Sequence, residues 1–346
     1  MNRKRFLSAL SAFSSALVFP IREAKAAASL HLSIKTDISA IPPYLKPGDT
    51  LGITAPAGHI TIERLGPAIS IMESWGYKVK IGNTIGKQDF SFGGTDEERA
   101  ADFQQMLDDP SIKAIMCARG GYGVVRIVDQ LDWARFKLRP KWIIGFSDVT
   151  VLHSHIQRNC GIATIHSKMC NSFPDDLAIS EPIQVQTIQS IQEALSGKQM
   201  AYTALPNSCN RAGIAEGTLV GGNLKVLETL SGTVSDINTA GKILFVEDTG
   251  EYLYSIDRMF WNLQRTGKLK TLKGLIVGGF NIKPDDEGEE FGRSLQEIIL
   301  SKVKNYTYPV CFDFPVGHQR ANFALKCGVK HRLKVTSDET TLIEIK

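Results

Sequence analysis

The sequence contains no cysteine spacing that is typical of a metal or redox site. Its six cysteines are far apart and include no Cys-x-x-Cys pair. They are Cys117, Cys160, Cys170, Cys209, Cys311 and Cys327. This pattern excludes a zinc ribbon, a thioredoxin-type motif and a small disulfide scaffold. We expect most of these thiols to be small buried apolar groups, although an exported protein could pair some of them.

Long membrane-spanning apolar runs and fixed-period repeats are also missing. The apolar stretch FLSALSAFSSALVF is too short and too rich in serine for a good membrane span. It follows the basic residues MNRKR and precedes AKA, which has the form of a signal-peptidase site. We therefore predict a signal peptide over residues 1–26, a periplasmic location, and no stable membrane insertion of the mature chain. An uncleaved N-terminal anchor is the alternative.

The mature chain has no excess charge of either sign. The whole sequence has a net charge of +4. Residues 1–26 contain five basic side chains and one acidic side chain, which also amounts to +4. The remaining residues are formally neutral, so nothing indicates a nucleic-acid partner. Their number is sufficient for two domains.

Strands and helices alternate in the first half of the chain. Three apolar runs end in small or polar residues: TLGITAPAG, IKAIMCARGGYG and KWIIGFSD. The segments ERLGPAISIMESWG, TDEERAADFQQMLDDP and VVRIVDQLDWARF have helical spacing. This alternation predicts a parallel sheet with helices on both faces, and functional sites at the carboxyl ends of its strands.

The second half predicts a smaller, β-rich mixed domain. GTLVGGNLKVLETLSG has a turn-rich composition, KILFVED and LKGLIVGGF are typical of strands, and YLYSIDRMFWNLQRTG is an amphipathic helix. A closing hairpin is expected in VKHRLKVTSDETTLIEI. We predict an N-terminal α/β domain over residues 40–185, a linker over 186–212 and a C-terminal domain over 213–346.

Ser147 lies in IIGFSDVT, where an apolar strand meets a helix. Serine and aspartate are favoured helix N-caps, so the local sequence by itself favours a capping role over a nucleophile. A catalytic serine needs a general base, and that base needs an orienting acceptor. His318 ends the run FDFPVGH, and Glu247 directly follows KILFV, where a buried carboxylate would require a partner. A surface loop and a strand-end turn are the plain structural alternatives for these two residues.

The other histidines are weaker candidates. His153 and His155 are two residues apart on a predicted helix and do not share a face, so a metal pair is not expected there. His59 could line a site after the first strand. His166 is expected to be structural, and His331 lies in the basic hairpin.

The chain resembles the LD-carboxypeptidases, the muramoyltetrapeptide carboxypeptidases of murein recycling. The resemblance covers nearly all of residues 45–335 and rests on motifs in the family's order: GDTLGITAPAG, ARGGYG, GFSDVT, GGNL, LFVEDTGEYLYSIDRM and PVGH. It implies a flavodoxin-like N-terminal domain, a smaller C-terminal domain and a triad of Ser147, His318 and Glu247. It also implies that no metal or organic cofactor is needed. The microcin C self-immunity peptidase is related and uses the same triad on a different substrate.

The resemblance also implies an oxyanion hole. The amide of Asp148 would form one half, and Gly120 or Gly121 in the glycine turn would form the other. Arg119, beside that turn, could bind substrate or form a structural salt bridge. The family often has His-Gly-Pro-Met after the nucleophile helix, whereas this chain has HSKM at residues 166–169.

Our hypothesis from the sequence is an exported serine carboxypeptidase that removes the terminal D-alanine from murein tetrapeptides, with a homodimer suggested by the relatives. The enzymatic alternative is a self-immunity type peptidase that cleaves an aminoacyl nucleotide or a similar amide. The non-enzymatic alternative is an exported binding protein in which the triad positions are fortuitous.

Overall fold

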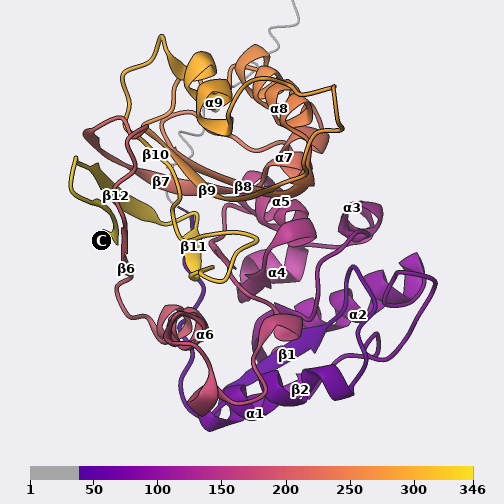
Figure 1. The fold of residues 1–346 in the computed structure, drawn as a ribbon. Coiled ribbons are helices and arrows are strands. Elements are labelled where there is room, and N and C mark those ends of the chain that lie inside the picture. The colour runs from indigo at the N-terminus through magenta and orange to yellow at the C-terminus, as the bar shows by residue number, and fades with distance from the viewer. Residues whose placement is uncertain (1–38, 346) are drawn as a thin grey trace, which may run out of the picture. The chain divides into compact units, whose positions relative to one another are not determined.

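The computed structural model describes residues 39–345, which belong to one compact unit built around two sheets (Figure 1). The predicted signal peptide lies outside the described residues. No helix within residues 39–345 is long and apolar enough to cross a membrane. All six cysteines are free, and four of them are buried, as predicted.

The first sheet has the flavodoxin-like strand order β2-β1-β3-β4-β5, and all of these strands are parallel. In this order their bounds are Lys78–Ile81, Thr50–Thr54, Ile112–Cys117, Trp142–Gly145 and Thr164–His166. A sixth strand, β11 (Leu325–Cys327), pairs antiparallel with β5. The predicted parallel sheet is therefore confirmed, and a segment from the far end of the chain extends it.

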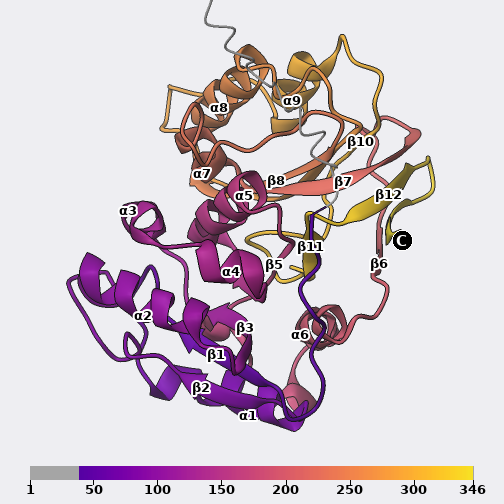
Figure 2. The ribbon, with the colours of Figure 1, turned by 180° about the vertical axis from the view of Figure 1, so that it is seen from behind.

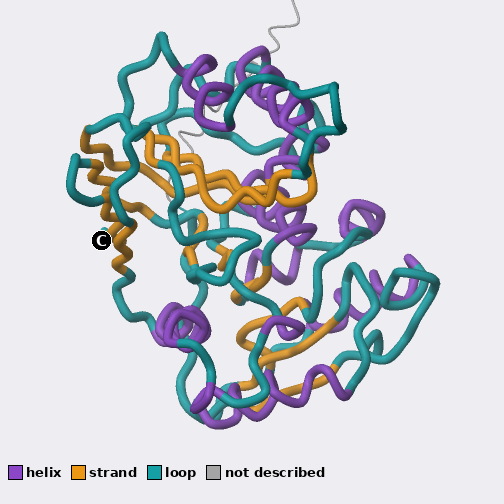
Figure 3. Tube along the Cα trace, viewed as in Figure 1, coloured by secondary structure: helices purple, strands orange, loops and turns teal. Residues whose placement is uncertain are grey.

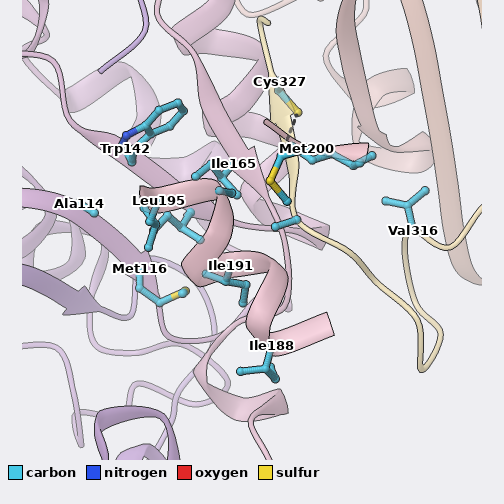
Figure 4. Packing of buried hydrophobic residues seen from close by; sticks show 14 of the residues in the cluster. Ala114, Met116, Trp142, Ile165, Ile188, Ile191, Leu195, Met200, Val316 and Cys327 are labelled. Carbon is cyan, nitrogen blue, oxygen red and sulfur yellow. Dashed lines mark hydrogen bonds between the residues drawn. The ribbon is translucent and has the colours of Figure 1, made fainter. Parts of the chain in front are cut away.

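Helices cover both faces of the first sheet because its buried strands are apolar on both sides. Ala114 and Met116 of β3 pack with α1 (Gly66–Ser74) and α6 (Pro182–Ser196), as Figure 4 shows for α6. The alternate residue Ile115 packs with α2 and α5 on the other face. The bounds of these two helices are Asp96–Asp108 and Thr150–Asn159.

The helix predicted in TDEERAADFQQMLDDP is confirmed as α2, and hydrogen bonds define its start. Thr95 accepts a hydrogen bond from the amide of Glu98, and the Glu98 side chain accepts one from the amide of Thr95. This reciprocal capping box satisfies two backbone donors that the first helical turn leaves unpaired.

The second sheet has the order β10-β9-β8-β7-β12-β13-β6. Strands β7 to β10 are parallel, and β12, β13 and β6 are joined to them by antiparallel pairing. In sheet order the bounds are Val310–Cys311, Gly274–Ile282, Ile243–Glu251, Gly213–Asn223, Lys330–Val335, Thr340–Glu344 and Ala201–Ala204. The predicted mixed sheet and the closing β12–β13 hairpin are both confirmed.

Three helices lie on one side of the second sheet, in both views of the ribbon (Figures 1 and 2). They are α7 (Leu224–Thr229), α8 (Leu253–Arg265) and α9 (Leu295–Val303). Residues from the other face, such as Phe245 and Ile276, join the same apolar cluster as the first sheet. The two sheets therefore share part of one core.

The prediction of a turn-rich segment around the GGNL motif is wrong. Residues Gly213–Asn223 form the strand β7, and α7 follows at once. Gly221 and Gly222 have φ angles of 146° and 145° within the strand. A Cβ on Gly221 would lie 1.9 Å from the carbonyl oxygen of Phe245. These glycines allow neighbouring atoms to approach the strand closely within the sheet, and they do not form a turn.

The prediction of one helix over VVRIVDQLDWARF is also wrong. The segment divides into α3 (Val124–Ile127), a 3-10 turn and α4 (Ala134–Leu138). The Asp132 side chain accepts a hydrogen bond from the amide of Ala134 at 2.8 Å. This local bond gives the backbone an alternative to a continuous helix and starts a new one.

The chain passes between the two sheets three times: through the segment that contains α6, through the loop 312–324, and by a short link from β11 to β12 (Figure 3). The residues predicted as a linker, 186–212, contain most of α6 and all of β6. The boundaries of the two domains stay a prediction. Residues 312–324, between β10 and β11, contain no helix or named strand, and His318 lies in this loop.

Candidate active site

Ser147 lies on a strained turn at the carboxyl end of β4. Its φ angle is 62°, a conformation that side-chain-bearing residues rarely adopt. The turn begins a 3-10 segment that runs directly into α5, and the cap position belongs to Phe146 rather than to Ser147. Strain of this kind costs about 1–3 kcal/mol and is characteristic of functional positions. The geometry therefore favours a nucleophile over the capping role.

Glu247 and His318 form a close pair. One carboxylate oxygen of Glu247, Oε2, accepts hydrogen bonds from Nδ1 of His318 at 2.6 Å and from its backbone N–H at 3.2 Å. Glu247 is completely buried, whereas 21% of the His318 side chain is exposed. A Cβ on Gly317, the residue before His318, would lie 2.4 Å from Cβ of Glu247. Glycine is therefore required where the loop passes the carboxylate.

Ser147 and His318 line the same hollow, which has a volume of about 740 Å³. Arg119, Gly120 and Gly121 line it as well. Glu247 lies behind His318 and orients the imidazole so that Nε2 is left for other contacts. The fold thus brings together a serine, a histidine and a carboxylate that are separated by up to 171 positions (318 − 147) in the sequence.

The Asp148 side chain ties the serine turn to the glycine turn. It is buried, and its Oδ2 accepts a hydrogen bond from the amide of Val124 at 2.8 Å.

The carbonyl of Gly120 accepts a hydrogen bond from the amide of Gly58 at 3.0 Å. A Cβ on Gly120 would lie 3.3 Å from Oγ of Ser147, so a larger residue would crowd that hydroxyl.

Burial raises the pKa of Asp148 to about 6, although hydrogen bonds from the amides of Val124 and Gly123 and the charge of Arg99 oppose this shift. The ordinary value is 3.8. Between pH 3.8 and about 6, the Asp148 carboxyl is therefore protonated in the folded state and ionised in the unfolded state. The contribution of Asp148 to the free energy of unfolding is fully present below pH 3.8. It is lost as the pH rises through about 6.

We expect the Asp148→Asn variant to lose this pH dependence. Between pH 4 and pH 7 the unsubstituted protein should lose roughly 2 kcal/mol of unfolding free energy relative to the variant, since one pKa unit corresponds to about 1.4 kcal/mol. Urea denaturation of both proteins across this range measures the difference. A difference that stays constant with pH would contradict the assignment of a raised pKa to Asp148.

Arg119 is held by the backbone rather than by an acidic side chain. Its Nη1 donates to the carbonyl oxygen of His59 at 2.8 Å. Within residues 39–345 Arg119 forms no ion pair, so the salt bridge that the sequence left open as an alternative is not found. His59 does not line the hollow, and its ring Nδ1 donates to the carbonyl of Lys87. His59 therefore contacts Arg119 through its main chain, and its ring does not reach the hollow.

The remaining described histidines are buried, which suits structural roles. Burial lowers the pKa of His153 and His331 to about 4 and that of His166 well below its usual range. His153 donates from Nε2 to the carbonyl of Gly145 at 2.9 Å and so supports the end of β4. Among the residues that the structure describes, no group of three potential ligands is placed to hold a metal ion.

Two residues near His318 were not identified as site residues from the sequence. Asn322 is fully buried, and its Oδ1 accepts a hydrogen bond from the amide of Gly317 at 2.9 Å. Nζ of Lys168 donates to the carbonyl of Gln319 at 2.7 Å. No local pattern distinguishes Asn322, and Lys168 was notable only as a departure from the family's motif.

Comparison with known proteins gives a consistent assignment. The model of the LD-carboxypeptidase N-terminal domain matches residues 51–167, and that of the LD-carboxypeptidase C-terminal domain matches residues 216–333. A probable murein peptide carboxypeptidase of Bacillus subtilis is 34% identical over 306 residues, which is 88% of this chain and 94% of that protein.

Solved structures agree with these sequence matches. Muramoyltetrapeptide carboxypeptidase from Oxalobacter formigenes has a TM-score of 0.76 at 27% identity, covering 86% of this chain and 99% of that chain. The microcin C7 self-immunity protein MccF, in complex with aspartyl sulfamoyl adenosine, has a TM-score of 0.77 at 25% identity. The match covers 89% of this chain and 98% of that chain.

A serine on a strained strand-to-helix turn, facing the same hollow as a histidine bound to a buried carboxylate, is typical of a serine hydrolase. The family matches narrow this class to peptidases. The chain belongs to the LD-carboxypeptidase family and is a serine carboxypeptidase of that family.

Proposed function

We propose that this enzyme hydrolyses the L,D peptide bond that joins the terminal D-alanine to murein tetrapeptides. The hydrogen bond between the buried Glu247 and His318, which lines the same hollow as Ser147, carries this proposal. Relatives named as murein peptide and muramoyltetrapeptide carboxypeptidases support the choice of substrate.

In the proposed mechanism, Nε2 of His318 takes the proton from Ser147 as its hydroxyl attacks the scissile carbonyl carbon. Glu247 accepts the Nδ1–H of His318, which selects the productive tautomer and stabilises the imidazolium. The imidazolium then protonates the leaving amine of D-alanine. Water, activated by the same imidazole, releases the peptide from Ser147.

Two backbone amides would stabilise the negative charge on the tetrahedral intermediate. One belongs to Asp148, the residue after the nucleophile, and the other to the glycine turn. Because the carbonyl of Gly120 is bonded to Gly58, the next N–H, that of Gly121, points in the opposite direction. This arrangement supports Gly121 rather than Gly120 as the second donor.

Three cationic side chains line the hollow and suit a substrate that carries several carboxylates. They are Arg119, Lys168 and Arg320. Arg320 is already paired with Glu181. We propose that Arg119, whose guanidinium has a backbone partner but no carboxylate among the described residues, binds the terminal carboxylate of the substrate.

The substrate proposal predicts stereochemical selectivity. The enzyme should release D-alanine from L-Ala-γ-D-Glu-diaminopimelate-D-Ala. It should cleave the pentapeptide that ends in D-Ala-D-Ala poorly, because the scissile bond there joins two D-residues and presents its carbonyl differently to Ser147. Chromatography with mass analysis of the two digests measures both rates. Equal cleavage of both peptides would contradict the assignment.

An aminoacyl-nucleotide substrate is the rival that this assay also tests. Of the described residues that line the hollow, Phe146 has the sole phenyl ring, and that ring packs against the imidazole of His318 with centroids 4.8 Å apart. An aromatic platform for a nucleobase would need to be free of such a contact. Cleavage of an aminoacyl sulfamoyl nucleotide but not of the tetrapeptide would favour the self-immunity type of activity.

We also propose that the enzyme is exported and acts in the periplasm. The basic residues MNRKR, the short apolar stretch and the AKA site support this proposal. The mature protein should begin near Ala27 and should be recovered outside the cytoplasm. N-terminal sequencing after cell fractionation tests this, and full-length protein in the cytosol would contradict it. A homodimer, which the resemblance implies, stays a prediction.

A further inference from the structure

The loop that carries His318 is held on both sides of that residue. On one side, the amide of Gly317 donates to Oδ1 of the buried Asn322 at 2.9 Å. On the other side, the carbonyl of Gln319 accepts a hydrogen bond from Nζ of Lys168 at 2.7 Å. His318 itself is bound to Glu247 through both its ring and its backbone N–H. Its position is therefore set by bonds at three consecutive residues.

These bonds come from different parts of the chain. Glu247 belongs to the second sheet, and Asn322 belongs to the same loop as His318. Lys168 instead follows β5, which pairs with β4 immediately before the Ser147 turn. Of the hydrogen bonds described above, the one from Lys168 joins residues 317–319 to the sheet that carries Ser147.

The surroundings of Lys168 favour a stable contact. Its ammonium lies 5.9 Å from the centre of the Phe146 ring, which in turn packs against the His318 ring. The side chain of Gln319 is occupied elsewhere, since its Nε2 donates to the carbonyls of Phe314 and Val316. This leaves the Gln319 main-chain carbonyl as a fixed acceptor. Burial lowers the pKa of Lys168, and the charge of Glu247 opposes that shift.

We propose that Lys168 is a positioning residue, whose hydrogen bond to the Gln319 carbonyl sets the placement of His318 relative to Ser147. This inference rests on the proposed function, in which His318 is the general base. It assigns a role to the residue at which this chain departs from the His-Gly-Pro-Met pattern. Since the base lies in the loop between β10 and β11 and the nucleophile lies on the turn after β4, a direct bond between these two segments limits the variation in their separation.

The alternative is that Lys168 binds a substrate carboxylate, because it also lines the hollow. The two roles affect different kinetic constants. Loss of a positioning bond lowers kcat with little change in KM, whereas loss of a substrate contact made equally in the ground state and the transition state raises KM.

The test compares Lys168→Met with Lys168→Arg on the full mature chain. We expect Lys168→Met to lower kcat by about ten- to a hundredfold, with KM within roughly threefold of the original. Lys168→Arg, which retains a cationic donor, should recover most of the loss. Lys113→Met is the matched control, because Lys113 also donates to a carbonyl but lies at the start of β3, outside the hollow. Unchanged kcat in Lys168→Met, or a raised KM alone, would overturn the proposal.

A structural readout separates this proposal from the choice of substrate. In a crystal structure of Lys168→Met, we expect residues 317–319 to be displaced relative to Ser147, while Glu247 and its strand stay in place. An unmoved loop would overturn the positioning role, whatever the substrate is. The rate at which a fluorophosphonate labels Ser147 gives a kinetic equivalent that needs no peptide. If the protein is labelled but does not cleave tetrapeptide, only the proposed substrate fails.

Discussion

Replacing Ser147 with alanine should lower the rate of tetrapeptide cleavage by roughly ten-thousandfold to a millionfold. The reason is that, in the proposed mechanism, the hydroxyl forms the covalent intermediate. The substitution should not unfold the protein, because alanine must adopt the same φ angle of 62° and gains no new strain relative to serine. Single-turnover assays with the purified tetrapeptide measure the loss, and circular dichroism confirms the fold.

Ser154→Ala is a matched control for this experiment. Ser154 lies on α5, the helix that follows the nucleophile turn, and its buried hydroxyl has no hydrogen-bond partner among the described residues. Its removal should leave activity within about twofold, because surrounding contacts are not broken. Near-normal cleavage by a folded Ser147→Ala protein would exclude Ser147 as the nucleophile.

The second large effect is expected for Glu247→Gln. The buried carboxylate accepts two hydrogen bonds from His318, and a neutral amide cannot stabilise the imidazolium that forms during the reaction. We expect kcat to fall by about a thousandfold to ten-thousandfold, by analogy with removal of the charge in other serine triads. The KM should change little, because Glu247 lies behind His318 and does not line the hollow.

Glu216→Gln is the matched control for Glu247→Gln, because it also removes a carboxylate from the second sheet. Glu216 lies on β7, is exposed, and pairs with Arg332 on the neighbouring strand. Exposed pairs of this kind contribute about 0–1 kcal/mol, so activity and stability should stay close to the original. Full activity of Glu247→Gln would show that His318 does not depend on this carboxylate for its role.

Much of the secondary structure could be predicted because its signals are local. The Thr95–Glu98 capping box and the apolar spacing of residues 253–265 identify α2 and α8 within a single segment. One of the two failures depends on a distant partner, and the other depends on a short-range side-chain bond. In the sequence Gly221 is typical of a turn, and only its contact with Phe245 identifies it as a strand residue. Asp132 interrupts a helical pattern through a side-chain bond that composition does not show.

The sequence alone determined most of the strands and helices, the flavodoxin-like class, and the three candidate residues, because each follows from local periodicity or from a family motif. Only the tertiary structure decided that Ser147 is strained, that Glu247 binds His318, and that both Ser147 and His318 face one hollow. It also decided that Lys168 reaches a carbonyl 151 positions away. Such contacts join residues that are far apart in the sequence, and their geometry depends on how the two sheets and the loop 312–324 pack together. Packing is a property of the whole fold that no local stretch of sequence specifies.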